Sequence, residues 1–511
     1  MILEKSARVI FTVELCYNIA IMDSEKRARR QSIRLIISET VMVFAVVAMV
    51  VVLAFLVSGY WLGSGFQVER QGMLQIGSVP IGATVAVDGE APWYQRTNTS
   101  KVLTSGEHTV SLTKEGYDSW NRTVNIRDGL LYRVNYPRLF LLEREKEVVY
   151  NGSTATLATI SPDHKWMLII NNTTAWQLLN LNSDKVEPKT ISVATLFDAV
   201  SMASGATTGL FMGEITELSW SEDNEHVLVK SRLDNKDEWA LLNIKNPTES
   251  VNITRQFATS FDEMRIFDNS ASILLAVKDS NLHKIDVPGR QVSAVLVEEI
   301  QSFDVFGSEI IFTAAVDAKS AYDSSDEILR QEEETLEEVA PAPNYYTGVV
   351  KLNDPERVSY ITSSQEPIRA FISRFYDEKY ITIITDAMIS VYKYGGTEAI
   401  FEGALNFNPD NVKVGHDGSF VFMNSGDQAI TLDMEALELR NWTLDTESYG
   451  WLDGHIVYSV KDGTLIVYDF DGLNRRTLSN NVSAHFPVTI TENKWLYYFS
   501  DDKLVREVIV Q

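Results

Sequence analysis

Residues 161–170 read SPDHKWMLII, and this stretch shows the pattern on which most of the chain is built. A polar turn, Ser161 to Lys165, leads into an uninterrupted apolar run, and a second apolar segment, AWQLLN, follows at residues 175–180. A short apolar run bounded by turn residues is typical of a strand that is buried on both faces. The stretch therefore predicts a pair of buried antiparallel strands.

The same unit recurs from residue 150 to the C-terminus with a period of about 40 residues, which is the size of one four-stranded propeller blade. Each polar turn precedes a strand-like run, and the turns begin at Ser161, Ser221, Asp268, Gly307, Tyr376, His416, Leu452 and Thr491. The pattern predicts a seven- or eight-bladed β-propeller over residues 150–511. A pair of β-sandwiches with similar strand spacing is the alternative.

Residues 465–476, LIVYDFDGLNRR, resemble the WD-like repeats of TolB-type propellers. Two segments interrupt the repeat. Residues 187–213 are rich in small side chains, and residues 193–202 within them have a helical pattern. Residues 317–344 form an acidic insertion in which five of the six glutamates cluster at residues 332–338, and we interpret it as a solvated excursion from one blade. The insertion lacks the spacing of a calcium loop.

Residues 72–140 alternate apolar and polar side chains, as half-buried strands do. Asp88-Gly89 is a typical hairpin turn, and a second hairpin is expected over residues 106–126. The stretches IGSVPIGATVAVDG and LTSGEHTVSLTKEGYDSWNRTVNI resemble a PEGA domain, although Pro80 to Ala83 read PIGA. The resemblance implies a small β-sandwich of the bacterial envelope that serves as a stalk or spacer, and it brings no catalytic residues.

Residues 40–62, TVMVFAVVAMVVVLAFLVSGYWL, hold no charged residue. Because about 20 apolar residues cross a bilayer as a helix, the run predicts one transmembrane helix that begins at Thr40. Tyr60 and Trp61 are expected at the membrane interface. The topology is set by basic residues before the run, namely Lys26, Arg27, Arg29, Arg30 and Arg34. The positive-inside rule places residues 1–39 in the cytoplasm as a short basic tail. A cleaved signal peptide is the alternative.

The expected order is therefore tail, helix, a connector at residues 63–71, β-sandwich and propeller, all β apart from the one helix. The single cysteine, Cys16, allows no intramolecular disulfide. The start of translation, at Met1 or Met22, stays open. The formal net charge of −25 argues against nucleic acid as a partner, because nucleic-acid binding depends on Lys and Arg.

No serine-nucleophile, HExxH or phosphate-loop motif is present, so we expect no catalytic, cofactor-binding or metal-binding residues. Tryptophans are interpreted mainly as blade cores, with stacking on sugar rings as the alternative; they include Trp166, Trp176, Trp220, Trp239, Trp442, Trp451 and Trp495. The sequence favours a non-enzymatic, single-pass protein of the cell membrane, whose extracytoplasmic propeller binds an envelope protein or polysaccharide. Two alternatives stay open: a glycan-active enzyme that uses the central funnel, and a sensor or assembly component that acts through a membrane partner.

Overall fold

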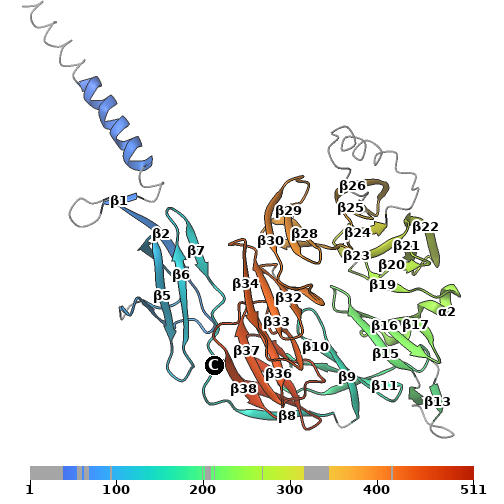
Figure 1. Cartoon of the computed structure of the whole chain (residues 1–511). Coiled ribbons are helices and arrows are strands. Elements are labelled where there is room, and N and C mark those ends of the chain that lie inside the picture. The colour runs from blue at the N-terminus through green and yellow to red at the C-terminus, as the bar shows by residue number, and fades with distance from the viewer. Residues whose placement is uncertain are drawn as a thin grey trace, which may run out of the picture. The chain divides into compact units, whose positions relative to one another are not determined.

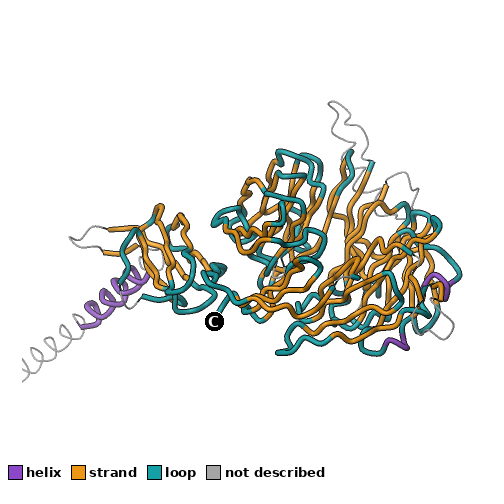
Figure 2. The backbone as a smooth tube through the Cα atoms, turned by 90° about the horizontal axis from the view of Figure 1, so that it is seen from below, coloured by secondary structure: helices purple, strands orange, loops and turns teal. Residues whose placement is uncertain are grey.

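The structure is a computed structural model of the 511-residue chain. It describes residues 38–54, 60–62, 68–92, 95–152, 154–197, 199–201, 209–211, 213–267, 269–315, 344–415 and 418–511. The chain divides into two compact units, residues 1–139 and 140–511. Strands are the main secondary structure of both units (Figures 1 and 2), which confirms a mostly β protein.

Residues 38–54 are helical, and their apolar side chains are exposed around the helix. Within the described part of the chain, no helix is long and apolar enough to cross a membrane. The expected helix over residues 40–62 is wrong at its C-terminal end, because β1 (Tyr60–Leu62) is a strand paired antiparallel with the start of β2 (Val68–Ile76). Aromatic residues favour strands, and pairing with β2 satisfies backbone hydrogen bonds there.

The first unit holds two small sheets packed around one core. One sheet contains β1, β2, β4 (Thr99–Thr104) and β7 (Leu131–Val134), and the other contains β3 (Thr84–Val87), β5 (Gly106–Thr113) and β6 (Trp120–Ile126). Trp120 is fully buried between them. The two expected hairpin features are confirmed, because Asp88 and Gly89 have φ values of 54° and 82° in a tight turn, and β5 pairs antiparallel with β6.

The second unit contains eight four-stranded antiparallel sheets, here called blades 1 to 8. Their first strands are β9 (Ala155–Ile160), β15 (Glu214–Trp220), β19 (Glu263–Ile266), β23 (Ile300–Phe306), β27 (Arg369–Phe375), β31 (Asn411–Val414), β35 (Ser448–Trp451) and β39 (Thr489–Thr491). Their second strands are β10 (Trp166–Asn171), β16 (His226–Leu233), β20 (Ile273–Lys278), β24 (Glu309–Ala315), β28 (Glu378–Ile384), β32 (Phe420–Ser425), β36 (Ile456–Lys461) and β40 (Trp495–Ser500).

The third strands are β11 (Ala175–Asn180), β17 (Lys236–Asn243), β21 (Asn281–Asp286), β25 (Tyr345–Lys351), β29 (Met388–Lys393), β33 (Gln428–Asp433), β37 (Thr464–Asp469) and β41 (Lys503–Val508). The outer strands are β12 (Pro188–Ser192), β18 (Val251–Asn252), β22 (Gln291–Val297), β26 (Asp354–Ser364), β30 (Ala399–Ala404), β34 (Glu438–Thr443), β38 (Arg476–Asn480) and, for blade 8, β8 (Lys146–Asn151). Short elements between blades are β13 (Ala199–Ser201), β14 (Gly209–Phe211), η1 (Pro247–Glu249) and α2 (Ile253–Phe257).

The blades form a closed ring. Eight buried hydrophobic clusters each join two successive blades, and the cluster that contains Met167 and Tyr497 joins blade 8 back to blade 1. The ring also closes through the backbone, because β8 precedes blade 1 in sequence but pairs with β41 of blade 8. These eight four-stranded blades are consistent with a β-propeller, at the upper of the two expected blade numbers.

The local pattern in the sequence corresponds closely to the blades. The described residues of the expected polar turns lie at or between the ends of the first and second strands, and the apolar runs that follow them are the second strands; Asp268, His416 and Asp417 lie outside the described residues. The helical pattern expected over residues 193–202 is wrong, because residues 199–201 form β13. In the acidic insertion, residues 317–343 lie outside the described residues, between the second and third strands of blade 4.

Candidate functional site

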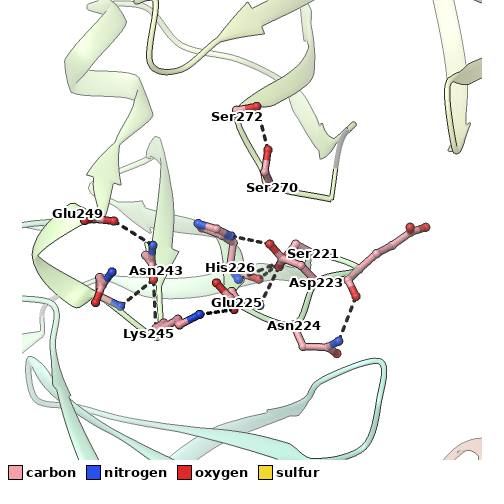
Figure 3. Close-up of polar contacts among 12 residues, drawn as sticks. Ser221, Asp223, Asn224, Glu225, His226, Asn243, Lys245, Glu249, Ser270 and Ser272 are labelled. Carbon is pink, nitrogen blue, oxygen red and sulfur yellow. Dashed lines mark hydrogen bonds and ion pairs between the residues drawn. The ribbon is translucent and has the colours of Figure 1, made fainter.

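The turn between the first and second strands of a blade, here called the inner turn, has a specific polar construction in blades 1 and 2. Ser161 Oγ donates to Asp163 Oδ1 at 2.6 Å and accepts the Trp166 backbone N–H at 2.9 Å. In blade 2, Ser221 Oγ donates to Asp223 and accepts the His226 N–H at 2.9 Å (Figure 3). Side-chain hydrogen bonds to the local backbone are what make Ser and Asp good turn residues.

Neighbouring inner turns contact one another at the same end of the ring. The Asp163 backbone N–H donates to Asn224 Oδ1 at 3.0 Å, which joins the turns of blades 1 and 2. His164 Nδ1 lies 2.6 Å from Thr489 Oγ1 in blade 8. The ring therefore has one end at which the inner turns gather.

The first strands lie side by side around the centre of the ring. Trp220 Nε1 of β15 donates to Thr159 Oγ1 of β9 at 3.1 Å, and Trp451 Nε1 of β35 donates to the Lys413 carbonyl of β31 at 3.3 Å. These contacts between first strands of neighbouring blades show that this edge of each blade faces a central channel.

A cavity of about 540 Å³ opens at the end of the channel where the inner turns gather. We call it the central cavity. Its lining comes from blades 1, 6, 7 and 8 and includes Lys413, Tyr449, Trp451, His164 and Thr489. The volume falls within the range of about 300–1,000 Å³ that is usual for small-molecule sites. The cavity is the candidate functional site.

Lys413 is the only charged residue on the four first strands around this cavity, β9, β31, β35 and β39. Its Nζ lies 4.9 Å from the centre of the Tyr449 ring, a cation–π contact. Among the described residues, no carboxylate forms an ion pair with it. The side chain is open to solvent, yet the surrounding protein lowers the pKa of the Lys413 ammonium by burial.

Tyr449 and Trp451 alternate along β35 and lie on the same side of it. Both rings pack against Phe422 of blade 6, with ring centres 5.8 Å and 6.0 Å from it. Since Phe422 is buried and the Trp451 indole N–H is hydrogen-bonded, these rings are held in fixed positions beside Lys413. The cavity wall therefore combines rigid aromatic surface with one cation.

The first strands of blades 2 to 5 carry a different set of side chains. Arg265 Nε lies 3.0 Å from Glu263 Oε1, and its NH1 atom lies 2.9 Å from Asp304 Oδ1 of the next blade. Lys230 Nζ lies 2.9 Å from Glu217 Oε1. Burial raises the pKa of the Asp304 carboxyl, and the charge of Arg265 offsets part of this rise. On this side of the channel Arg265 pairs with Glu263 and Asp304, whereas Arg374 of β27 lies over the Phe306 ring at 5.8 Å from its centre and Arg369 donates to the Pro409 carbonyl oxygen at 2.6 Å.

We therefore name two parts of the channel wall. The aromatic arc consists of β9, β31, β35 and β39, and the ionic arc consists of β15, β19, β23 and β27. A glycan-active enzyme would need two carboxyl groups, or a histidine with a carboxylate, at one mouth of the channel. In the described lining of the central cavity, His164 faces Thr489 and no Asp or Glu is present. In the ionic arc, Glu263 and Asp304 share the guanidinium of Arg265.

The residues expected to anchor the chain in a membrane or to set its topology lie in different parts of the structure or outside the described residues. Thr40 lies in the described helix, whereas Tyr60 and Trp61 lie in β1. The basic residues expected to set the topology lie outside the described residues; they are Lys26, Arg27, Arg29, Arg30 and Arg34. Among the described residues, no group of three or more His, Cys, Asp or Glu side chains could hold a metal ion.

Sequence reasoning identified Trp451 only as one of several tryptophans, and it missed Lys413 and Tyr449. Lys413 lies two positions before the inner turn of blade 6, in the sequence NVKVG. Aligning the eight first strands by their turns would have shown that this lysine is the only charge on four of them. It would not have shown that blades 6, 7, 8 and 1 share a cavity.

Comparison with known protein families gives one match, over residues 71–138, which fit the PEGA domain. Residues 71–138 are a PEGA domain. The match agrees with the resemblance seen in the sequence, and the two sheets of the first unit, apart from β1 and the start of β2, make up this domain. No curated protein sequence matches the chain.

Solved structures similar to the chain include an oligogalacturonate lyase in complex with manganese, with 13% identity, a TM-score of 0.36, and coverage of 57% of this chain and 88% of the other. The Cps50 (Swd1) β-propeller domain of Myceliophteria thermophila is 9% identical with a TM-score of 0.38, and the match covers 72% of this chain and all of that domain. The computationally designed Ika8 protein is 10% identical with a TM-score of 0.40, covering 71% and 98%.

The PEGA domain carries one ion pair with altered titration. His108 Nδ1 lies 2.7 Å from Asp88 Oδ2, and His108 Nε2 lies 2.7 Å from the Thr104 carbonyl oxygen. Desolvation lowers the pKa of His108, but the hydrogen bonds to Asp88 and Thr104 outweigh it and raise that pKa overall. The hydrogen bonds from His108 and the Thr109 N–H lower the pKa of Asp88. The pair fixes the Asp88-Gly89 turn against β5.

Proposed function

We propose that the chain is a membrane-anchored binding protein of a bacterial cell envelope, and that its propeller binds an extracytoplasmic protein or polysaccharide without catalysing a reaction. The central cavity carries the binding part of the proposal. It is open to solvent, has the volume of a ligand site, and is walled by fixed aromatic rings. A closed ring of blades holds such a wall rigid, so a ligand can bind without the entropic cost of ordering the wall.

The membrane part of the proposal is supported by the N-terminal sequence. The run at residues 40–62 is uncharged, and five basic residues lie shortly before it, at positions 26–34. In the described helix, large apolar side chains are exposed along its length, including Val41, Phe44, Val47, Val51 and Leu53. Exposed apolar surface of this kind requires an apolar partner, and a lipid bilayer supplies one.

Membrane attachment is tested by introducing Val47→Asp and Val51→Asp together and measuring the share of full-length chain in carbonate-washed membranes. We expect the wild type in the membrane and the double variant in the soluble fraction, because each buried Asp costs about 2.5–3.5 kcal/mol at the centre of a bilayer. The matched control is Val292→Asp with Val295→Asp, at two valines of β22 that are 41% and 42% exposed. Equal membrane retention of all three proteins would contradict the proposal.

The binding role is tested with the full chain in detergent, incubated separately with protein and polysaccharide fractions of the envelope. Saturable retention of one fraction with unchanged glycan length supports a binding protein. Shortened glycans would instead support a glycan-active enzyme. That second candidate is favoured by the ionic arc, where Glu263 and Asp304 both contact Arg265 and burial raises the pKa of Asp304. In that case Asp304→Asn would abolish glycan cleavage.

A further inference from the structure

We propose that the central cavity binds the uronic acid units of an acidic polysaccharide, with Lys413 holding the sugar carboxylate and Tyr449 and Trp451 contacting the sugar ring. This inference rests on the proposed binding function and names the ligand class and the site. It follows from three features of the cavity, which are its charge, its aromatic wall and its hydroxyl groups.

The charge of the cavity selects an anion. The chain has a formal net charge of −25, yet the only charged residue on the first strands of the aromatic arc is a lysine. Its described partner is the face of Tyr449, which leaves the ammonium protons available. A carboxylate that enters the cavity gains a charge-assisted hydrogen bond, and the partly desolvated surroundings strengthen it.

The aromatic wall selects a ligand with a C–H face. The faces of aromatic rings are electron-rich, and the axial C–H groups of a pyranose carry partial positive charge, so the two attract. Packing against Phe422 fixes the positions of Tyr449 and Trp451, with ring centres 5.8 Å and 6.0 Å away. The sugar ring therefore meets a surface that needs no rearrangement to receive it.

Neutral hydrogen-bonding groups complete the lining. Thr489 Oγ1 contacts His164 Nδ1 at 2.6 Å, and Thr159 Oγ1 accepts the Trp220 indole N–H at 3.1 Å. Both hydroxyl groups belong to residues of the cavity wall and retain further hydrogen-bonding capacity. Hydroxyl groups of a sugar can form hydrogen bonds with these two threonines. A carboxylate on an otherwise apolar ligand would leave the threonine hydroxyl groups without a ligand contact.

The experiment is a calorimetric titration of the full-length chain in detergent with a trisaccharide of glucuronic acid, and separately with its neutral methyl ester. The variants are Lys413→Gln, which removes the charge, and Lys413→Arg, which keeps it. The matched control is Lys494→Gln, because Lys494 also lies over an aromatic ring, at 4.7 Å from Trp495, but outside the cavity lining. Near-ultraviolet circular dichroism verifies that each variant is folded.

We expect the wild type to bind the trisaccharide and to bind the methyl ester about tenfold or more weakly, since a hydrogen bond to a charged group is lost. Lys413→Gln should weaken binding of the charged trisaccharide by a similar factor. Lys413→Arg and Lys494→Gln should retain most of the affinity. Trp451→Ala should weaken binding of both the trisaccharide and its ester, because the ring contact does not depend on charge.

The inference is overturned if folded Lys413→Gln binds as tightly as wild type, if the ester binds equally well, or if the trisaccharide does not bind. Binding of a peptide with a free carboxyl terminus in place of the sugar would also overturn it. Failure of this inference can be told apart from failure of the broader binding proposal. If Lys413→Gln still retains the same envelope fraction as wild type, the binding function stands and the uronate site is wrong.

Discussion

The two arcs of the channel are built on the same blade backbone but differ in their charged residues, because the ionic arc contains carboxylates and the aromatic arc contains none. In the ionic arc, Arg265 contacts both Glu263 and Asp304, so each buried or half-buried charge has a partner. In the aromatic arc, Lys413 has an aromatic face in place of a carboxylate. The pair of Arg265 with Asp304 joins two blades, whereas Lys413 has a cation–π contact and no ion pair, so its charge remains available for an anionic ligand.

The comparison teaches how a ring of similar blades acquires one distinct site. Every blade needs its apolar second and third strands, because those strands form the clusters between blades. The first strands also contribute to these clusters, as Phe371 of β27 and Phe303 of β23 do, but their remaining side chains differ from blade to blade. Function is therefore expected where the first strands depart from charge pairing.

The largest expected effect is at the ring-closing seam, where β8 pairs with β41 in blade 8, which also supplies β39 of the aromatic arc. Glu507 of β41 is fully buried, and its carboxylate lies 2.7 Å from Lys146 Nζ of β8 and 3.6 Å from Arg144 Nε. Lys146→Met should lower the free energy of unfolding of the propeller by about 3 kcal/mol, because it leaves a buried carboxylate poorly compensated. Calorimetric unfolding of the full chain measures this.

The double variant Lys146→Met with Glu507→Leu should recover most of that loss, because no buried charge remains. Lys185→Met is the matched control, since Lys185 is 84% exposed in an exposed pair with Glu187. A seam variant no less stable than the control would show that the ion pair does not hold the ring closed.

The next effect is in the ionic arc. Arg265→Met should lower the free energy of unfolding by about 1 kcal/mol, a modest amount because the pair is partly exposed, with Arg265 at 45% and Asp304 at 35%. It should also raise the pKa of Asp304 further, because the charge that offsets burial is gone. Denaturant unfolding and carbon-detected NMR titration measure the two quantities. An unchanged Asp304 titration would mean that the pair does not form in solution.

The same substitution in the aromatic arc should act with the opposite sign. Lys413→Met should leave stability unchanged or raise it by less than about 1 kcal/mol, because an incompletely solvated charge is replaced by an apolar side chain. Burial lowers the pKa of Lys413 below its ordinary 10.5, so the folded state binds the proton less tightly than the unfolded state. The free energy of unfolding of the wild type should therefore rise as the pH increases from the folded pKa of Lys413 to 10.5. This rise should be absent in Lys413→Met. A clear loss of stability would place Lys413 in a structural role.

The smallest expected change in stability is in the PEGA domain. There the ion pair of His108 with Asp88 serves as a reference for a paired cation outside the ring. The raised pKa of His108 means that its contribution is complete below the ordinary value of 6.5 and is lost as the pH rises through the folded pKa. The lowered pKa of Asp88 means that its contribution is present above 3.8 and is lost as the pH falls. His108→Gln should remove the first dependence, at a cost below about 1 kcal/mol, since Asp88 is 52% exposed. NMR titration of the His108 ring and unfolding at pH 5 and 8 test the sign.

Much of the fold could be predicted because the signals are local. The inner turns depend on hydrogen bonds within a few residues, as Ser161 with Asp163 shows, and the second strands are continuous apolar runs. The Asp88-Gly89 turn follows from the conformational freedom of those two residues. Prediction failed at Tyr60–Leu62, because an uncharged apolar run fits both a helix and a strand, and pairing with β2 decided between them.

The sequence by itself determined the repeat, the polar turns and the PEGA domain. Only the tertiary structure decided that β8 completes blade 8, that Glu507 meets Lys146, and that blades 6, 7, 8 and 1 share a cavity around Lys413. The physical reason is the distance along the chain between the groups that meet. Turns and strand periods are set by neighbours in sequence. Ring closure joins residues separated by most of the propeller, and only the packing of the blades brings their charged and aromatic side chains together.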